Sequence, residues 1–231
     1  MSRARRATRP RRRTVVLDFG GVLSASHDPA PAVHALVGGD LEAVREAIWA
    51  HRPPYDRGES TLLEYWSAVA AAAGVEALTE DEALELQDAD NRSFLALDPD
   101  ARALLHDLAR AGLPLVLLSN ASTGFGEAVR KAEWFEVFSF AVISAEERTM
   151  KPEREIYEIV LDALAHENGG VRRPSDAVFF DDREENVAAA RALGIDAHHW
   201  ERNDPARGEG VPNPAVLAAR RILADRGVLA D

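Results

Sequence analysis

Short apolar runs alternate with amphipathic segments along most of this chain of 231 residues. The apolar runs that we predict to be strands are 14–18, 114–119, 138–143, 177–181 and 196–200. The segments that we predict to be helices, from apolar residues at helical spacing, are 98–111, 123–133, 153–166, 184–193 and 214–226. Because strands and helices alternate, the sequence predicts an α/β fold with a doubly wound parallel sheet.

The region 28–94 breaks this alternation, because it contains no convincing strand. Its apolar positions recur at helical spacing, which predicts three or four short helices. The breaks between them are expected at Gly38-Gly39, Pro53-Pro54 and Gly74. A connection this long is unusual between a strand and the next helix. We therefore interpret 28–94 as a helical cap inserted into a core domain formed by 14–27 and 95–231.

The charge of the chain is unevenly distributed. The formal net charge is -12, yet residues 1–13 carry seven arginines and no acid, so the remaining chain carries -19. This acidic body argues against nucleic acid as the main partner. We expect the arginine-rich leader 1–13 to be disordered.

The composition also limits the location of the protein. No apolar stretch approaches the ~20 residues that span a bilayer, and no signal peptide is visible. The chain has no cysteine, which excludes disulfides and thiolate metal sites. We expect a cytoplasmic protein with no membrane partner, either a monomer or a homodimer.

Carboxylates stand at the ends of two predicted strands. Asp18 ends the first run and opens onto a glycine turn, whereas Asp181 and Asp182 end the fourth, with Asn186 four residues further on. A parallel sheet brings the carboxyl ends of its strands to one edge, where open α/β folds bind ligands. Clustered carboxylates without histidine or cysteine suit a hard cation such as Mg²⁺.

Lysine is nearly absent from the chain. Only Lys131 and Lys151 occur, against 25 arginines, so arginine serves wherever a positive charge suffices. A lysine that remains is a candidate for a role that the planar guanidinium cannot fill. We single out Lys151, which precedes a proline at the start of a predicted helix, and interpret Lys131 as a surface charge.

Together with Ser119, at the end of the second strand, the strand-end carboxylates and Lys151 form a set that suits phosphoryl transfer. A metal ion and a lysine can neutralise phosphate oxygens while a carboxylate attacks phosphorus.

Four motifs in this order resemble the haloacid dehalogenase superfamily. They are Asp18-Phe-Gly-Gly-Val-Leu, Leu117-Leu118-Ser119-Asn120, Lys151-Pro152 and Phe180-Asp181-Asp182-x-x-x-Asn186. The chain is most similar to the IA-like branch, which has a helical cap after the first strand, and its segment 55–66 is similar to the cap pattern of that branch. The resemblance covers about residues 14 to 200.

The resemblance implies a Mg²⁺-dependent phosphatase of a small phosphorylated metabolite. Asp18 would be the nucleophile and would form an aspartyl-phosphate intermediate. Asp18, the carbonyl of Gly20 and Asp182 would bind the metal ion, with Asp181 as a ligand or a support.

The same resemblance implies a phosphate site. Ser119 and Lys151 would contact the phosphate, together with the backbone N–H groups of Asn120 and Gly21. Asn186 would order the acidic loop.

The chain departs from the pattern of the superfamily at Gly20. Phosphatases of this superfamily usually carry there a second aspartate, which protonates the leaving group and then activates water. General acid–base help contributes about 10²–10⁴-fold in rate. Three explanations stay open: His27, Asp28 or a cap residue takes over the role, the substrate has a good leaving group, or the site binds phosphate without fast turnover. A second departure is Arg148, near which the family often has glycine.

Two other functions stay open beside the phosphatase. A regulatory, weakly catalytic phosphate-binding protein on the same scaffold would account for Gly20. A metal-independent 2-haloacid dehalogenase would use Asp18 to attack carbon, but would have no use for the acidic pair. Whichever holds, the cap residues that could contact the substrate include Arg45, Arg52, Tyr55 and Arg57.

Overall fold

The computed structural model describes residues 13–25, 28–167, 173–202, 207 and 210–229. The leader, apart from Arg13, and His27 lie outside these ranges. No helix within the described ranges is both long and apolar enough to cross a membrane.

The sheet has five strands, all parallel. They are β1 (Thr14–Leu17), β2 (Leu115–Ser119), β3 (Phe140–Ile143), β4 (Ala177–Asp181) and β5 (Asp196–His199). Their order is β3-β2-β1-β4-β5, so the first strand occupies the centre and the chain adds strands on either side of it. The predicted doubly wound α/β fold is confirmed, and each predicted strand is present.

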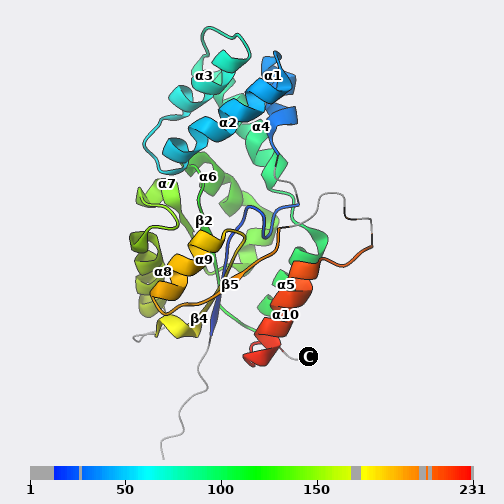
Figure 1. Ribbon diagram of the computed structural model, residues 1–231, viewed down its shortest axis with the longest axis vertical. Helices are drawn as coiled ribbons and strands as arrows, with labels where there is room; N and C mark the ends of the chain where they lie inside the picture. The colour runs from blue at the N-terminus through cyan, green and yellow to red at the C-terminus, as the bar shows by residue number, and fades with distance from the viewer. Residues whose placement is uncertain (1–12, 26–27, 168–172, 203–206, 208–209, 230–231) are drawn as a thin grey trace, which may run out of the picture.

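Helices cover both faces of the sheet (Figure 1). On one face lie α5 (Pro99–Arg110), α6 (Thr123–Lys131) and α10 (Pro214–Asp225), and on the other lie α8 (Arg154–Glu167) and α9 (Glu184–Ala192). Side chains of β1 alternate between the two cores, because Val15 and Leu17 belong to the first and Val16 to the second. A strand that is buried on both faces reads as a continuous apolar run, which is why the sequence marks it clearly.

Short helical turns adjust the predicted bounds. The helix predicted at 123–133 ends at Lys131 and is followed by a 3₁₀ helix, η1 (Glu133–Val137). A single helical turn, α7 (Ser144–Glu147), follows β3, and a second 3₁₀ turn, η2 (Pro174–Asp176), precedes β4. Lys151, which we predicted at the start of a helix, lies in the turn between α7 and α8.

Four helices stand together beyond the carboxyl edge of the sheet (Figure 1). They are α1 (Ala30–Val37), α2 (Leu41–Asp56), α3 (Leu62–Ala72) and α4 (Glu80–Phe94). They enclose a core of their own around Tyr65 and Trp66. The break predicted at Pro53-Pro54 comes after Asp56 instead, because both prolines lie inside the last turn of α2. Neither proline can donate an N–H to the preceding turn, and the helix ends two residues beyond them.

Two segments connect these helices to the sheet, and they pair with each other. Ala25 N–H donates to the carbonyl of Ala96 at 2.7 Å, and Asp98 N–H donates to the carbonyl of Leu23 at 2.9 Å. Ser24 and Leu97 form an antiparallel bridge between them. The chain therefore leaves and re-enters the core at one place.

Candidate active site

The residues predicted at strand ends meet at one edge of the sheet. Asp18 follows β1, and its N–H donates to the carbonyl of Phe180 at 3.0 Å, which extends the ladder with β4 by one residue. Ser119 and Asp181 are the last residues of β2 and β4, the two strands that flank β1. Strand pairing alone therefore brings these side chains to one place.

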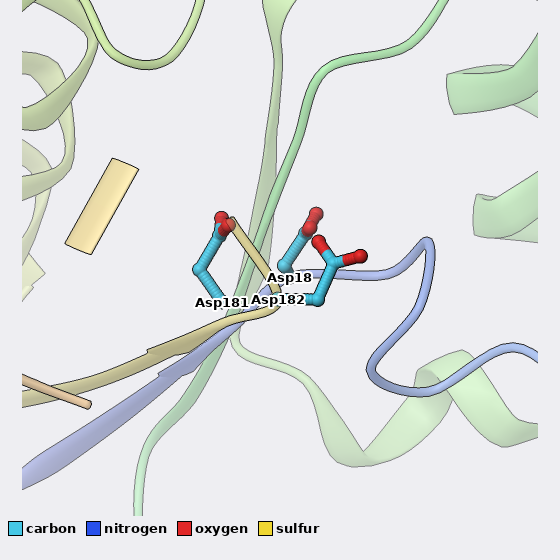
Figure 2. Close-up of side chains that lie close together, drawn as sticks. All are labelled: Asp18, Asp181 and Asp182. Carbon is cyan, nitrogen blue, oxygen red and sulfur yellow. The ribbon is translucent and has the colours of Figure 1, made fainter. Parts of the chain in front are cut away.

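Three carboxylates converge at this edge (Figure 2). Asp18, Asp181 and Asp182 each offer one oxygen, and these oxygens all lie within 4.8 Å of one another. The strand order explains the convergence, because Asp181 at the end of β4 and Asp182 directly after it lie beside Asp18, which follows the neighbouring strand β1. A set made only of oxygen donors fits a hard divalent cation such as Mg²⁺ better than a softer metal.

Lys151 lies among these carboxylates, with a side chain that is 1% exposed. Its ammonium group donates to Asp181 Oδ2 at 2.6 Å and to the carbonyl of Leu118 at 2.8 Å, and it forms an ion pair with Asp18 Oδ1 at 2.8 Å. All three protons of the ammonium therefore have acceptors. Burial lowers the pKa of Lys151, but the charges of Asp18 and Asp181 outweigh that effect and raise the pKa above its ordinary value.

The backbone of Lys151 is fixed by Asn120. The side-chain amide of Asn120 donates to the carbonyl of Lys151 at 2.8 Å and accepts from its N–H at the same distance. This reciprocal pair ties the loop after β2 to the turn that carries the lysine. We had predicted only a backbone role for Asn120, and the sequence contains no signal for this pairing.

The carboxylate of Asp18 is buried, and the contacts described for it fall on one oxygen. Oδ1 accepts from the N–H of Phe19 at 2.7 Å and pairs with Lys151. Burial raises the pKa of Asp18, and although Lys151 lowers it, Asp181 and Asp182 raise it further. One cation thus serves a cluster of three acids, which makes the site favourable for a second cation.

Asp181 and Asp182 differ in their surroundings. Both oxygens of Asp181 are engaged, Oδ2 with Lys151 and Oδ1 with Asn186 Nδ2 and the N–H of Arg183, each at 2.9 Å. Asp182 instead pairs with Arg202, whose side chain is 60% exposed. An ion pair with an exposed arginine contributes little to stability, so a metal ion could displace Arg202 from Asp182. Asp182 is therefore more available to a metal ion than Asp181.

The glycine turn after Asp18 passes close to Asp182. Gly21 has a φ of +76°, and a Cβ atom there would lie 2.3 Å from Asp182 Oδ2. Only glycine combines this backbone conformation with this close approach. A Cβ atom at Gly20 would meet nothing within 4 Å, so sterics alone would permit a side chain there.

A cleft lies between the sheet edge and the cap helices. Its lining includes Asp18, Ser119, Lys151 and Asp182 on the core side. An adjoining chamber shares Ser119 and extends between aromatic walls, of which Phe19 is one. Ser119 is buried, and it lines both the cleft and the chamber, where a ligand could reach it.

The cap contributes two charged residues to the cleft, Arg52, which the sequence singled out, and Asp56, which it did not. Of the predicted cap contacts, Arg52 lines the cleft, where it forms an ion pair with the buried Asp90. The other three are engaged elsewhere: Arg45 with Asp28 and Glu42, Arg57 with Glu153, and Tyr55 with Gln87. Asp56 was missed, although it lines the cleft and is only 7% exposed. Its signal was the acid in the cap segment 55–66, a segment that supported the resemblance but in which we assigned no role to Asp56.

The backbone of Arg148 is left-handed, a conformation that favours the glycine that the family often has near this position. It has φ +56° and ψ +27°, in the left-handed region, at the end of α7. A residue with a Cβ atom is disfavoured there by roughly 1–2 kcal/mol. Its side chain does not line the cleft.

A family model described as haloacid dehalogenase-like hydrolase matches residues 12–194. Among curated proteins, the chain is similar to the sesquiterpene phosphatase astK of Aspergillus oryzae, with 33% identity over 107 residues. The match covers 45% of this chain and 51% of the fungal protein, so the chain spans about half the length of that relative.

Solved structures share the fold. One is a HAD family enzyme of Bacteroides thetaiotaomicron in complex with magnesium and inorganic phosphate, with 20% identity and a TM-score of 0.62 over 86% of this chain and 97% of that one. Another is a dehalogenase with an intermediate complex, with 20% identity and a TM-score of 0.64 over 94% and 99%. At these identities, the likeness concerns the fold alone.

Replacing Lys151 by arginine tests whether the compact ammonium is required. Lys151→Arg keeps the charge, but it forces a larger planar group into a buried site with three acceptors, and we expect it to lower the free energy of unfolding by about 1–3 kcal/mol. Lys131→Arg is the control, because Lys131 is exposed on α6 and surface changes usually stay within about 0.5 kcal/mol. Urea unfolding gives both values. Equal stabilities of the two variants would contradict this interpretation of Lys151.

A buried acid with a raised pKa destabilises the folded protein as the pH rises. Burial raises the pKa of Asp56 from 3.8 to about 7, with Arg52 lowering it and Asp90 raising it. The folded state therefore holds this proton over a pH range in which the unfolded chain has lost it, and stability falls as the pH rises towards the folded value.

Asp56→Asn removes this charge, so we expect the variant to be more stable than the wild type at about pH 8. The rise of the Asp56 pKa from 3.8 to about 7 sets an upper limit of about 4 kcal/mol on this difference in stability. The difference in the free energy of unfolding between the variant and the wild type should shrink towards pH 4, where the carboxyl group of Asp56 is protonated. Unfolding in urea at pH 4 and pH 8 measures this difference. A difference that does not change with pH would mean that Asp56 is not held in this environment.

Proposed function

The chain belongs to the haloacid dehalogenase-like hydrolases, and we propose that it is a Mg²⁺-dependent phosphatase that transfers the phosphoryl group of a small phosphorylated metabolite to Asp18. The observation that carries the proposal is the buried ammonium of Lys151 between Asp18 and Asp181. It keeps the first carboxylate fixed at the mouth of the cleft, where a nucleophile would act. No feature of an ordinary core requires a lysine there.

Asp18 is the nucleophile in this proposal. Lys151 holds Oδ1, so the other oxygen, Oδ2, is the one that can attack phosphorus. Because Lys151 remains charged, it also attracts the dianionic phosphate into a cleft that already contains three acids. Fixing the carboxylate before the substrate arrives reduces the reorganisation that the reaction requires.

The phosphate would rest on groups from three loops. The hydroxyl of Ser119 and the N–H groups of Asn120 and Gly21 are the donors that we assign to it. Asn120 can hold its backbone in place because its side chain is tied to the turn at Lys151. Successive N–H groups in such turns form sites for anions.

Asp18, Asp182 and the carbonyl of Gly20 would hold Mg²⁺, which neutralises charge on the phosphate when it is bound. Asp181 acts as a support, since both its oxygens are engaged. Asn186 completes this support, because its backbone carbonyl accepts from the hydroxyl of Tyr157 at 2.9 Å while its amide holds Asp181.

One curated relative is a phosphatase, which supports the proposal. Among the structural neighbours, one holds magnesium and inorganic phosphate and another is a dehalogenase, so the choice between these functions rests on the residues of this chain. A metal-independent dehalogenase would gain nothing from Asp181 and Asp182. A protein that only binds phosphate would account for Gly20, but it would not need a nucleophile held by Lys151.

The cap would select the substrate. The chamber beside the phosphate site is lined by aromatic residues of both the core and the cap, namely Phe19, Trp49, Phe94 and Phe125. Such walls favour a substrate with an apolar or aromatic portion near its phosphate. The indole of Trp49 is 47% exposed, which a bound substrate would reduce.

Phosphate release from para-nitrophenyl phosphate and a panel of phosphate monoesters tests the proposed function. We expect release with Mg²⁺, loss of release with EDTA, and loss by at least about 10³-fold in Asp18→Asn, because the amide cannot form the phosphoryl intermediate. Asp28→Asn is the control, since the carboxylate of Asp28 pairs with Arg45 outside the cleft. Release that persists in EDTA or in Asp18→Asn would overturn the proposal.

A further inference from the structure

Gly20 leaves the proposed phosphatase without the acid that phosphatases of its superfamily usually carry at this position. Of the residues that could replace it, His27 lies outside the described residues, whereas Asp28 accepts from Ala30 N–H and pairs with Arg45. Among the described residues of the cap, the carboxylate that lines the cleft is that of Asp56.

We propose that Asp56, the last residue of α2, is the general acid and base of this site. The inference rests on the proposed phosphatase function, because it names the group that moves protons in that reaction. It identifies Asp56 as a catalytic residue that contacts the leaving group, in place of a side chain at Gly20.

No hydrogen bond among the described residues accounts for the burial of Oδ1 of Asp56, although the charge of Arg52 acts on the carboxylate. The residue is 7% exposed. Burying a carboxylate oxygen without a hydrogen bond is costly, so its retention calls for a function. Asp56 lines both the cleft and the adjoining chamber, and in both it shares the lining with Gly20 and Ser119. It thus faces the position that lacks an acid.

Contacts with the core hold Asp56 in this position. Ser144 Oγ, in the turn after β3, donates to the backbone carbonyl of Asp56 and accepts from the N–H of Ala121. Gly58 lies so close to the core that a Cβ atom would meet the carbonyl of Ala145 at 2.5 Å. Arg57 pairs with Glu153, next to the turn of Lys151. The end of α2 is therefore docked on the catalytic loops, unlike the distant part of the cap.

The charges around Asp56 leave it able to carry a proton near neutral pH. Arg52 approaches from α2 and Asp90 from α4, and these two are themselves an ion pair. The charged groups that face it across the cleft are Asp18, Lys151, Asp182, Arg183 and Arg202. Burial raises the pKa of Asp56 to about 7, which is close to the value that suits a general acid and base at that pH.

The proton moves in two steps. First, an oxygen of Asp18 bonds to phosphorus, the bond from phosphorus to the leaving oxygen breaks, and the carboxyl group of Asp56 gives its proton to that oxygen. Second, a water oxygen bonds to phosphorus, its proton passes to the carboxylate of Asp56, and the bond from phosphorus to Asp18 breaks. Orthophosphate leaves, and both aspartates return to their starting states.

The test compares leaving groups in the full-length protein with Mg²⁺. Para-nitrophenyl, phenyl and benzyl phosphate are similar in shape, and their leaving alcohols become steadily less acidic. In Asp56→Asn, we expect kcat/KM for benzyl phosphate to fall by about 10²–10⁴-fold and that for para-nitrophenyl phosphate to change by less than about tenfold, since nitrophenolate leaves without a proton. A burst of nitrophenol equal to the enzyme concentration should precede a slow steady state, because hydrolysis of the intermediate also loses its base.

Two controls separate this inference from its premise. Asp28→Asn should keep the leaving-group dependence of the wild type, and circular dichroism should find Asp56→Asn folded. If Asp56→Asn lowers kcat/KM for all three esters by one factor, or for none, Asp56 is not the general acid. If the wild type hydrolyses no ester, the proposed function itself fails. We expect kcat/KM to depend weakly on the acidity of the leaving alcohol in the wild type. We expect this dependence to become strong in Asp56→Asn alone.

Discussion

The site depends on one buried ammonium group. Lys151 gives its three protons to Asp18, Asp181 and the carbonyl of Leu118, on three adjacent segments of the sheet edge. Without it, two buried carboxylates would repel each other at the edge of the sheet, and removing one partner of such an arrangement typically costs about 3–5 kcal/mol. In a chain with 25 arginines and two lysines, the lysine remains where only a compact cation has room for three acceptors.

The rest of the architecture serves this interaction. The strand order places β1 between β2 and β4, so that the acids at 18 and 181 face one cation. Asn120 then fixes the backbone of Lys151, and docking of α2 on the core sets Asp56 across the cleft. A buried carboxylate oxygen with no hydrogen bond from the described residues lowers the stability of the folded protein, which is a cost that active sites retain when function requires it.

Sequence reasoning reached the sheet and the strand-end residues because their signals are local. A strand buried on both faces is a continuous apolar run, and a polar residue that ends such a run at 18, 119 or 181 is conspicuous. The side-chain role of Asn120 and the burial of Asp56 could not be predicted in this way, since both depend on contacts between segments distant in the chain. The prolines of α2 placed the break slightly too early, because the helix continues for two residues beyond them although they lack two N–H donors.

Trapping the covalent intermediate tests the central claim most directly. The protein with Mg²⁺ would be mixed with a phosphate ester that it hydrolyses, quenched in acid at a series of short times, digested, and analysed by mass spectrometry. The account predicts one phosphoryl group on the peptide that contains Asp18, appearing before free phosphate and decaying as phosphate accumulates. Turnover with the phosphoryl group on another residue, or with no phosphorylated peptide at any quench time, would contradict it.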